Sequence, residues 1–167
     1  MSAFATSYVP TTTVAVTRAV DVASNTSIGS WYNAAAGTMV VAFDLNTAAA
    51  TSGIVSCGTA ASYGLLAFKS GGVTVQEYFD NNGTTVGNMV NGAITKMAVA
   101  YDGGISNAAA LNGAAPVSSA VQAAITTPNK LFLGIVYTGA SQMTGHIRSF
   151  TYYSQRLSNA QLQSFTT

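Results

Sequence analysis

The sequence predicts an all-β fold, an antiparallel β-sandwich with one short helix at its C-terminus. Short segments alternate apolar and polar residues with the two-residue period of a strand. Turn signals separate these segments at intervals of roughly ten residues, which is typical of sandwiches and barrels rather than of alternating strand–helix folds. Almost no helical pattern is present until a well-defined helix start near the C-terminus.

Residues 1–15 are predicted to form an extended N-terminal arm, and residues 16–167 the sandwich domain. The arm contains Pro10 and a run of threonines, which indicate extended chain rather than a core strand. At 167 residues the chain suits one domain with a substantial core, and no internal repeat is visible.

Four segments in the middle of the chain alternate clearly enough to assign a shared face. The residues that share it are Met39, Val41, Phe43 and Leu45; Val73, Val75, Glu77 and Phe79; Thr95, Met97, Val99 and Tyr101; and Leu131, Leu133 and Ile135. Glycine-containing pairs between the strands predict turns. They are Gly71–Gly72, Asn82–Gly83, Asn91–Gly92, Asp102–Gly104 and Asn112–Gly113.

Two later segments are less regular. Residues 106–124 are alanine-rich and weakly patterned, and we interpret them as a short strand followed by a loop. Residues 147–153 are rich in β-branched and aromatic side chains, as a strand is. Ile147 and Phe150 cannot point the same way on an unbroken pleat, so a bulge is predicted near Arg148.

The C-terminal helix has a complete start signal. Ser158 is placed to cap the first free amides, and Gln161, three residues later, can accept from the amide of the cap. Leu157 and Leu162 flank the cap at the two positions where apolar side chains pack across a helix start.

The chain contains few charged residues, and this limits the kinds of partner that it is expected to bind. Only 7% of residues are charged, against about 25% in ordinary domains, and the net charge is +1. Proteins with so little self-repulsion tend to associate. Two explanations stay open: a small-residue β protein with an unusual composition, or a chain that packs against other subunits as a homo-oligomer.

The same composition speaks against nucleic acid and membranes. The six basic residues are scattered and form no cluster that could follow a phosphate backbone. No run approaches the roughly 18 apolar residues of a spanning helix, and no secretory signal is visible. Cys57 is the single cysteine, so no internal disulfide can form, which fits synthesis in a reducing cytoplasm.

The inventory of catalytic side chains is thin. Glycoside hydrolysis needs two carboxylates about 5–9.5 Å apart, and Glu77 and Asp80 point to opposite faces if they share a strand. His146 is the only histidine, so neither a zinc site nor a Ser-His-Asp arrangement is supported unless a distant acid pairs with it. We interpret His146 as a strand residue and Cys57 as a small buried side chain.

Two further features suggest binding rather than catalysis. Residues 80–83, Asp-Asn-Asn-Gly, offer oxygen ligands for calcium, but a hairpin turn is favoured because the loop holds a single acid. Exposed aromatic rings can stack on sugars, yet in all-β domains they more often pack in the core. The aromatic residues in question are Trp31, Tyr32, Tyr63, Tyr137, Tyr152 and Tyr153.

The chain resembles the laminin-G-like (concanavalin A-like) domains of tailed-bacteriophage virion proteins. The resemblance rests on four segments in the same order: residues 7–23, 30–43, 96–116 and the C-terminal GHIRSFTYYSQRLSNAQL. It implies a laminin-G-like β-sandwich in which Trp31 and Tyr152 are core residues. Arg18 and Asp21 also match, and they are expected to hold the arm to the sandwich by a salt bridge.

The resemblance implies a non-enzymatic structural protein on the surface of a phage particle, assembled in the bacterial cytoplasm with other capsid or tail proteins. Phage domains of this type often follow a larger N-terminal region, whereas this chain opens with Met1, so either a free-standing protein or an excised module is expected. A capsid decoration protein is favoured over a tail fibre or spike.

The alternative is a glycan-binding module for host polysaccharide, with Asn81, Asn82 and Tyr137 as candidate contacts. A glucanase-like enzyme is the third and least supported hypothesis, and no cofactor is expected.

Overall fold

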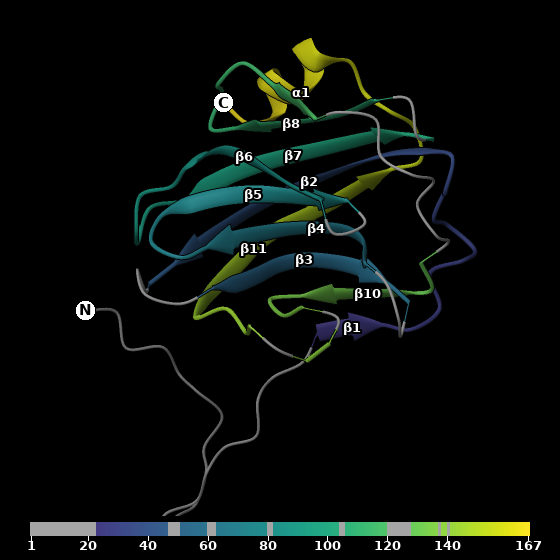
Figure 1. Cartoon of the computed structure of the whole chain (residues 1–167), viewed down its shortest axis with the longest axis horizontal. Helices are drawn as coiled ribbons and strands as arrows, with labels where there is room; N and C mark the ends of the chain where they lie inside the picture. Colours follow the sequence, from purple (N-terminus) through teal and green to yellow (C-terminus); the bar gives the residue numbers. More distant parts are fainter. Residues whose placement is uncertain are drawn as a thin grey trace, which may run out of the picture.

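The computed structural model describes residues 23–46, 51–59, 63–79, 82–103, 106–119, 128–136, 138–139 and 141–167. Within these residues the chain forms two antiparallel sheets that pack face to face, with one helix at the C-terminus (Figure 1). The predicted all-β sandwich with a short C-terminal helix is therefore confirmed. The predicted arm, residues 1–15, lies outside the described residues.

The first sheet has six strands in the order β1, β10, β3, β4, β5, β6. Their bounds are β1 Ala23–Asn25, β10 Lys130–Leu133, β3 Ser52–Gly58, β4 Tyr63–Ser70, β5 Thr74–Phe79 and β6 Asn82–Asn88. The second sheet has five strands in the order β11, β2, β7, β8, β9. Their bounds are β11 Gly145–Tyr153, β2 Ala36–Leu45, β7 Thr95–Asp102, β8 Ser106–Leu111 and β9 Val117–Ser119, and helix α1 spans Asn159–Phe165.

The main core lies between the two sheets, where the predicted alternating faces meet. Buried residues of the five-stranded sheet are Met39, Val41, Phe43, Leu45, Met97, Val99 and Tyr101, and those of the six-stranded sheet include Val55, Cys57, Ala67, Val75 and Leu131. Each strand contributes every second residue to this core, which also encloses the polar side chains of Glu77 and Thr95.

The five-stranded sheet also buries its second face, under α1. Four alanines of β7 and β8 contact Leu157 and Leu162 from the helix and the segment before it; they are Ala98, Ala100, Ala108 and Ala110. Small side chains at these positions let the helix lie close to the sheet. Thr38, also buried, accepts a hydrogen bond from the amide of Leu157 at 2.9 Å and so fixes the chain that leads into α1.

Two local predictions were wrong in detail. Residues 106–124 contain two strands, β8 and β9, where one was expected, because alanines buried on both faces hide the alternation. Asn82 and Gly83 lie in β6 rather than in a turn, with Phe79 opposite Asn82.

The bulge predicted near Arg148 is present. The register of β11 against β2 shifts between Ile147 and Ser149, so that Ile147 and Phe150 both pack against the main core. The extra residue is Arg148, whose side chain is thereby released from the regular pleat.

Candidate functional site

The outer face of the six-stranded sheet carries no helix of the described chain. Helix α1 contacts β7 and β8 on the other sheet, as Figure 1 shows. Among the described strands, β10, β5 and β6 therefore present one side to the core and the other outward, whereas every residue of β3 is buried. This outward side is the candidate binding face.

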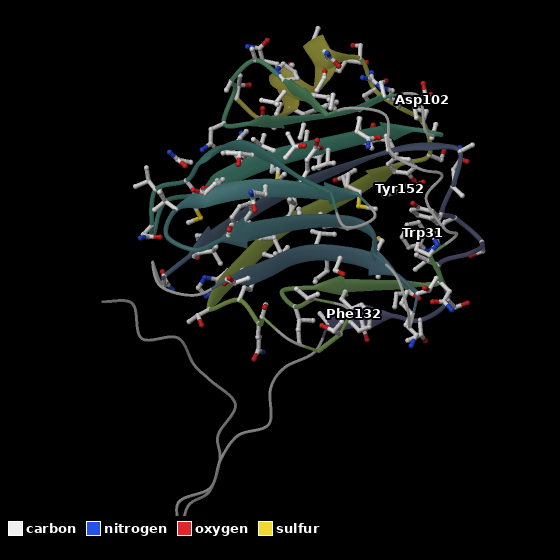
Figure 2. All side chains as sticks on the ribbon, viewed as in Figure 1. Trp31, Asp102, Phe132 and Tyr152 are labelled. Atoms are coloured by element: carbon white, nitrogen blue, oxygen red, sulfur yellow. The ribbon has the colours of Figure 1, made fainter. Side chains whose placement is uncertain are left out.

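One row of the binding face runs across β1, β10 and β3. Ser24 lies opposite Phe132, and Phe132 lies opposite Ser56. Directly opposite residues share a face, and the neighbours Leu131 and Leu133 pack in the core, so Phe132 points outward. Its ring is half-buried between the two serines, and Figure 2 places it near the margin of the sandwich.

The ammonium group of Lys130 lies on the same face of β10 as the Phe132 ring. Lys130 precedes Phe132 by two residues on β10, so both side chains lie on the same face. The residue opposite Lys130 is Gly58, which has no side chain to fill the adjoining position. Within the described residues, Lys130 forms no ion pair with a carboxylate.

A second polar pair lies on the same face, on β5 and β6. Gln76 is opposite Thr85, and the Nε2 of Gln76 donates to Oγ1 of Thr85 at 3.3 Å. Gln76 alternates with the buried Val75 and Glu77, so its side chain points outward. The binding face thus combines one aromatic ring with an amide, hydroxyls and an ammonium group. Because β10 and β5 are three strands apart, roughly 14 Å, the ring and the amide can contact different units of an oligosaccharide rather than one sugar ring.

The aromatic residues predicted as core positions form a compact cluster at one end of the sandwich. The rings of Trp31 and Tyr152 meet edge to face with centroids 5.1 Å apart, and Figure 2 shows the two side by side. Tyr32 stacks against Tyr152 and Tyr101, with centroids 5.7 and 5.9 Å away. The cluster therefore packs mainly on itself.

Hydrogen bonds occupy the hydroxyls of Tyr101 and Tyr152, whereas the buried hydroxyl of Tyr32 has no hydrogen-bond partner among the described residues. The Tyr101 hydroxyl donates to the carbonyl of Asn33 at 2.6 Å, and the Asn33 amide donates to the Tyr152 hydroxyl at 2.8 Å. Burial raises the pKa of Tyr101 and of Tyr32 above the ordinary tyrosine value. Trp31 and Tyr152 both pack against the main core.

A charged cluster that the sequence did not reveal lies on the outer face of the five-stranded sheet. Asp44 is opposite His146 across β2 and β11. Its Oδ1 accepts from Nδ1 of His146 at 2.7 Å, and its Oδ2 accepts from Nε of Arg148 at 2.6 Å. Desolvation alone would raise the pKa of Asp44, but these two hydrogen bonds and the charge of Arg148 hold that pKa below its ordinary value.

Asp44 and Glu77 do not form a hydrolytic pair. Asp44 lies outside the sandwich on one sheet, whereas Glu77 is buried inside it on the other. Across the described part of the chain, no group of three histidine, cysteine or acidic residues is arranged to hold a metal ion. Cys57 is buried as predicted, and burial raises the pKa of its thiol to about 12.

The residues predicted as glycan contacts are only partly described. Asn81 and Tyr137 lie outside the described residues, and Asn82 begins β6 opposite Phe79. Arg18 and Asp21, predicted to form a salt bridge, also lie outside them.

The predicted structural residues near the C-terminus take their expected places. Ile147 packs against the main core, and Leu157 and Leu162 pack in the second cluster. Ser158 and Gln161 form the complete capping box.

No helix in the described part of the chain is long and apolar enough to span a membrane.

The chain matches no protein-family model and no curated protein sequence. Its fold is nevertheless similar to solved carbohydrate-binding modules of the CBM40 type. The CBM40 of Ruminococcus gnavus IT-sialidase, solved with α2,3-sialyllactose, superimposes with a TM-score of 0.66 at 18% identity, covering 79% of this chain and 83% of that one. The same module with α2,6-sialyllactose gives equal values.

A sialidase is also similar over part of its length. A Trypanosoma rangeli sialidase mutant with trans-sialidase activity gives a TM-score of 0.65 at 10% identity. The match covers 80% of this chain but 23% of the sialidase, so this chain corresponds to about a quarter of that enzyme. At such low identities these comparisons show the fold, a lectin-like β-sandwich shared by binding modules and by a segment of a larger enzyme.

Proposed function

We propose that this protein is a non-catalytic glycan-binding module, which was the alternative hypothesis from the sequence. The observation that supports it most is the likeness in fold to CBM40 modules over about four fifths of both chains. Those modules were solved with sialyllactose bound. A shared fold does not by itself fix a ligand, so the proposal also depends on the side chains of the binding face.

The binding face has the chemistry that a sugar requires. Phe132 supplies an apolar ring for stacking, and Gln76 and Thr85 supply amide and hydroxyl groups. Lys130 adds a positive charge beside the ring, which would favour a sugar that carries a carboxylate. The β5–β6 connection, with Asn81 and Asn82, adjoins Gln76 and Thr85 in sequence, so the predicted contacts extend the same proposal.

Binding by the intact chain to an array of glycans tests the proposal, with sialyllactoses and bacterial surface polysaccharides as probes. Phe132→Ala is expected to weaken binding about tenfold or more, since stacking on one aromatic ring contributes on the order of 1–2 kcal/mol. Phe165→Ala is the matched control, because Phe165 is 43% exposed on α1, over the other sheet. It should leave binding unchanged.

Two outcomes would contradict this proposal. The intact protein could bind none of the glycans at millimolar concentration, or Phe165→Ala could lower binding as much as Phe132→Ala. A separate measurement tests the claim that the module is not a hydrolase: incubation with sialyllactose or β-glucan should release neither sialic acid nor reducing ends. Release that Asp44→Asn or Glu77→Gln abolishes would identify an enzyme instead.

The proposed setting for this module is the surface of a bacteriophage particle, where it would contact other virion proteins and further copies of itself. The resemblance of the terminal segments and the low charge of the chain support this setting. A capsid decoration protein is favoured over a tail fibre or spike module. Mass spectrometry of purified particles, followed by a density map of the virion, would locate the chain. Its absence from intact particles would refute the setting without affecting the glycan proposal.

A further inference from the structure

The outer face of the five-stranded sheet is only partly covered by the helix. Helix α1 contacts β7 and β8, whereas β11 lies at the other margin of the sheet, beyond β2 (Figure 1). Asp44 of β2 and its partners His146 and Arg148 of β11 lie on this part of the face. We call these three residues, together with the exposed Ser149, the charged patch.

The carboxylate of Asp44 fixes the direction of the Arg148 guanidinium. Its Oδ2 accepts from Nε of Arg148 at 2.6 Å, and Nη2 lies 2.6 Å from the same oxygen. Nε and Nη2 form one edge of the planar guanidinium, so the second edge, between Nη1 and Nη2, points away from Asp44. This second edge has no partner among the described residues. Asp44 is 5% exposed, so a ligand that approaches the patch meets the guanidinium before the carboxylate.

The β-bulge explains how this edge comes to lie in solvent beside small side chains. Arg148 is the extra residue of the bulge, so its side chain is released from the regular alternation of β11. The next residue, Ser149, is exposed and lies opposite Ala42 of β2. Within the described chain its hydroxyl forms no hydrogen bond. A methyl group and a hydroxyl leave room for a small ligand group next to the guanidinium.

A second cation borders the patch. Lys96 of β7 lies opposite Ala42, which lies opposite Ser149, so the three residues form one row across the outer face. The Nζ of Lys96 donates to the main-chain oxygen of Thr167, which uses one of the three donors of an ammonium group. Lys96 and Arg148 therefore lie on either side of Ala42, and an anion held over Ala42 would be attracted from both sides.

We propose that Arg148 and Ser149 form a binding site for an oxyanion, that is, for the carboxylate, phosphate or sulfate group of a ligand. Two oxygens of such a group would accept from Nη1 and Nη2 of Arg148, in the two-pronged geometry that guanidinium groups favour. A hydroxyl proton of Ser149 would bond one of the same oxygens. Because Asp44 already holds the guanidinium, binding costs little side-chain entropy. The site lies on the other sheet from the binding face and does not depend on the glycan proposal.

The single histidine of the chain gives a direct test by nuclear magnetic resonance. His146 and Arg148 share the carboxylate of Asp44, so the imidazole signals of His146 report on a ligand at Arg148 and need no assignment. Inorganic phosphate and glucuronate are the probes, each titrated at constant pH and ionic strength because salt screens exposed charges. Each should shift the imidazole signals along a saturating curve. Tighter binding of glucuronate would indicate a carboxylate-bearing sugar as ligand, and tighter binding of phosphate a phosphate group.

Three variants distinguish a site from general attraction by charge. Arg148→Gln should weaken binding of both probes about tenfold or more. Arg148→Lys keeps the charge but lacks the two-pronged edge, and it should recover only a small part of that loss. Lys130→Gln removes the same charge from the other sheet and is the matched control for this measurement, with an expected change of less than about twofold.

Two results would overturn the proposal. Signals of the wild-type protein that do not saturate up to about 100 mM of either probe would show that no site exists. Equal weakening by Lys130→Gln and Arg148→Gln would assign the shifts to the net charge of the chain. The wild-type titration requires no variant, so this part of the test does not depend on how a substituted chain folds.

Discussion

The carboxylate of Asp44 accepts hydrogen bonds from two side chains on the outer face of its sheet, those of His146 and Arg148. Its side chain is 5% exposed, but its partners His146 and Arg148 are 34% and 49% exposed. The carboxylate is therefore covered by its own partners rather than by the core. Such a group joins β11 to β2 at the position of the bulge, where the regular backbone pairing is interrupted.

Replacing Asp44 by Asn should destabilise the fold by about 1–2 kcal/mol, because two charge-assisted hydrogen bonds weaken while the partners regain water. Urea unfolding of Asp44→Asn measures this. Ser149→Ala, an exposed change on the neighbouring strand β11, is the control and should lie within about 0.5 kcal/mol of the wild type. Equal stability of all three proteins would show that the cluster contributes nothing to the fold.

The same cluster predicts a loss of stability in acid. The pKa of Asp44 is lowered in the folded state, so the unfolded chain takes up its proton more readily than the folded one. The contribution of Asp44 is therefore complete above the unfolded value of about 3.9 and is lost as the pH falls through the lower folded value. Unfolding free energies at pH 6 and pH 3 should differ more in the wild type than in Asp44→Asn. A difference of the same size in both would assign the acid sensitivity to other groups.

At the scale of the element, α1 shows how local chemistry starts a short helix. The amide of Gln161 donates to Oγ of Ser158 at 3.3 Å, and the amide of Ser158 donates to Oε1 of Gln161 at 2.9 Å. A seven-residue helix cannot be stable alone, so the cap and the contacts of Leu162 with the alanines of β7 and β8 must act together.

Ser158→Ala removes the side chain that accepts from the first turn, and it should lower stability by about 1 kcal/mol. Ser164→Ala lies within the same helix, does not alter the cap, and should be neutral or slightly stabilising. Thermal unfolding of the three proteins compares them directly. If Ser164→Ala lowered the Tm as much as Ser158→Ala, the effect would come from the helix surface and not from the cap.

Features that depend on residues close together in the sequence could be predicted. Features that depend on how distant strands pair could not. The capping residues lie within four positions of one another, and the bulge follows from the spacing of Ile147 and Phe150. Asp44 and His146 are 102 positions apart and meet only because β2 pairs with β11 in one register. Phe132 was not singled out for the same reason: its row with Ser24 and Ser56 exists only once three distant strands are aligned.

At the scale of the whole molecule, the two sheets differ in what covers them. The five-stranded sheet is buried on one side by the core and on the other by α1 over β7 and β8. The six-stranded sheet has the core on one side and the binding face on the other. Substitutions on the binding face therefore leave the contacts of α1 untouched.

The scarcity of charge predicts how the whole molecule behaves in solution. With a net charge of +1 and a pI near 7.8, copies of the chain repel one another little at neutral pH. Association should therefore be detectable by sedimentation velocity at pH 7.5. Exposed neutral residues away from the binding face, Asn46, Asn91 and Ser164, offer positions for added lysines.

The triple lysine variant distinguishes two kinds of association. It raises the net charge from +1 to +4, since three neutral residues become positive. Non-specific association should then fall strongly, because like charges on every copy oppose contact at any orientation. A homo-oligomer with a defined interface elsewhere should keep its stoichiometry and plateau at one size as concentration rises. A wild-type chain that stays monomeric at pH 7.5 up to about 100 µM would contradict the prediction that this surface is built to pack against other subunits.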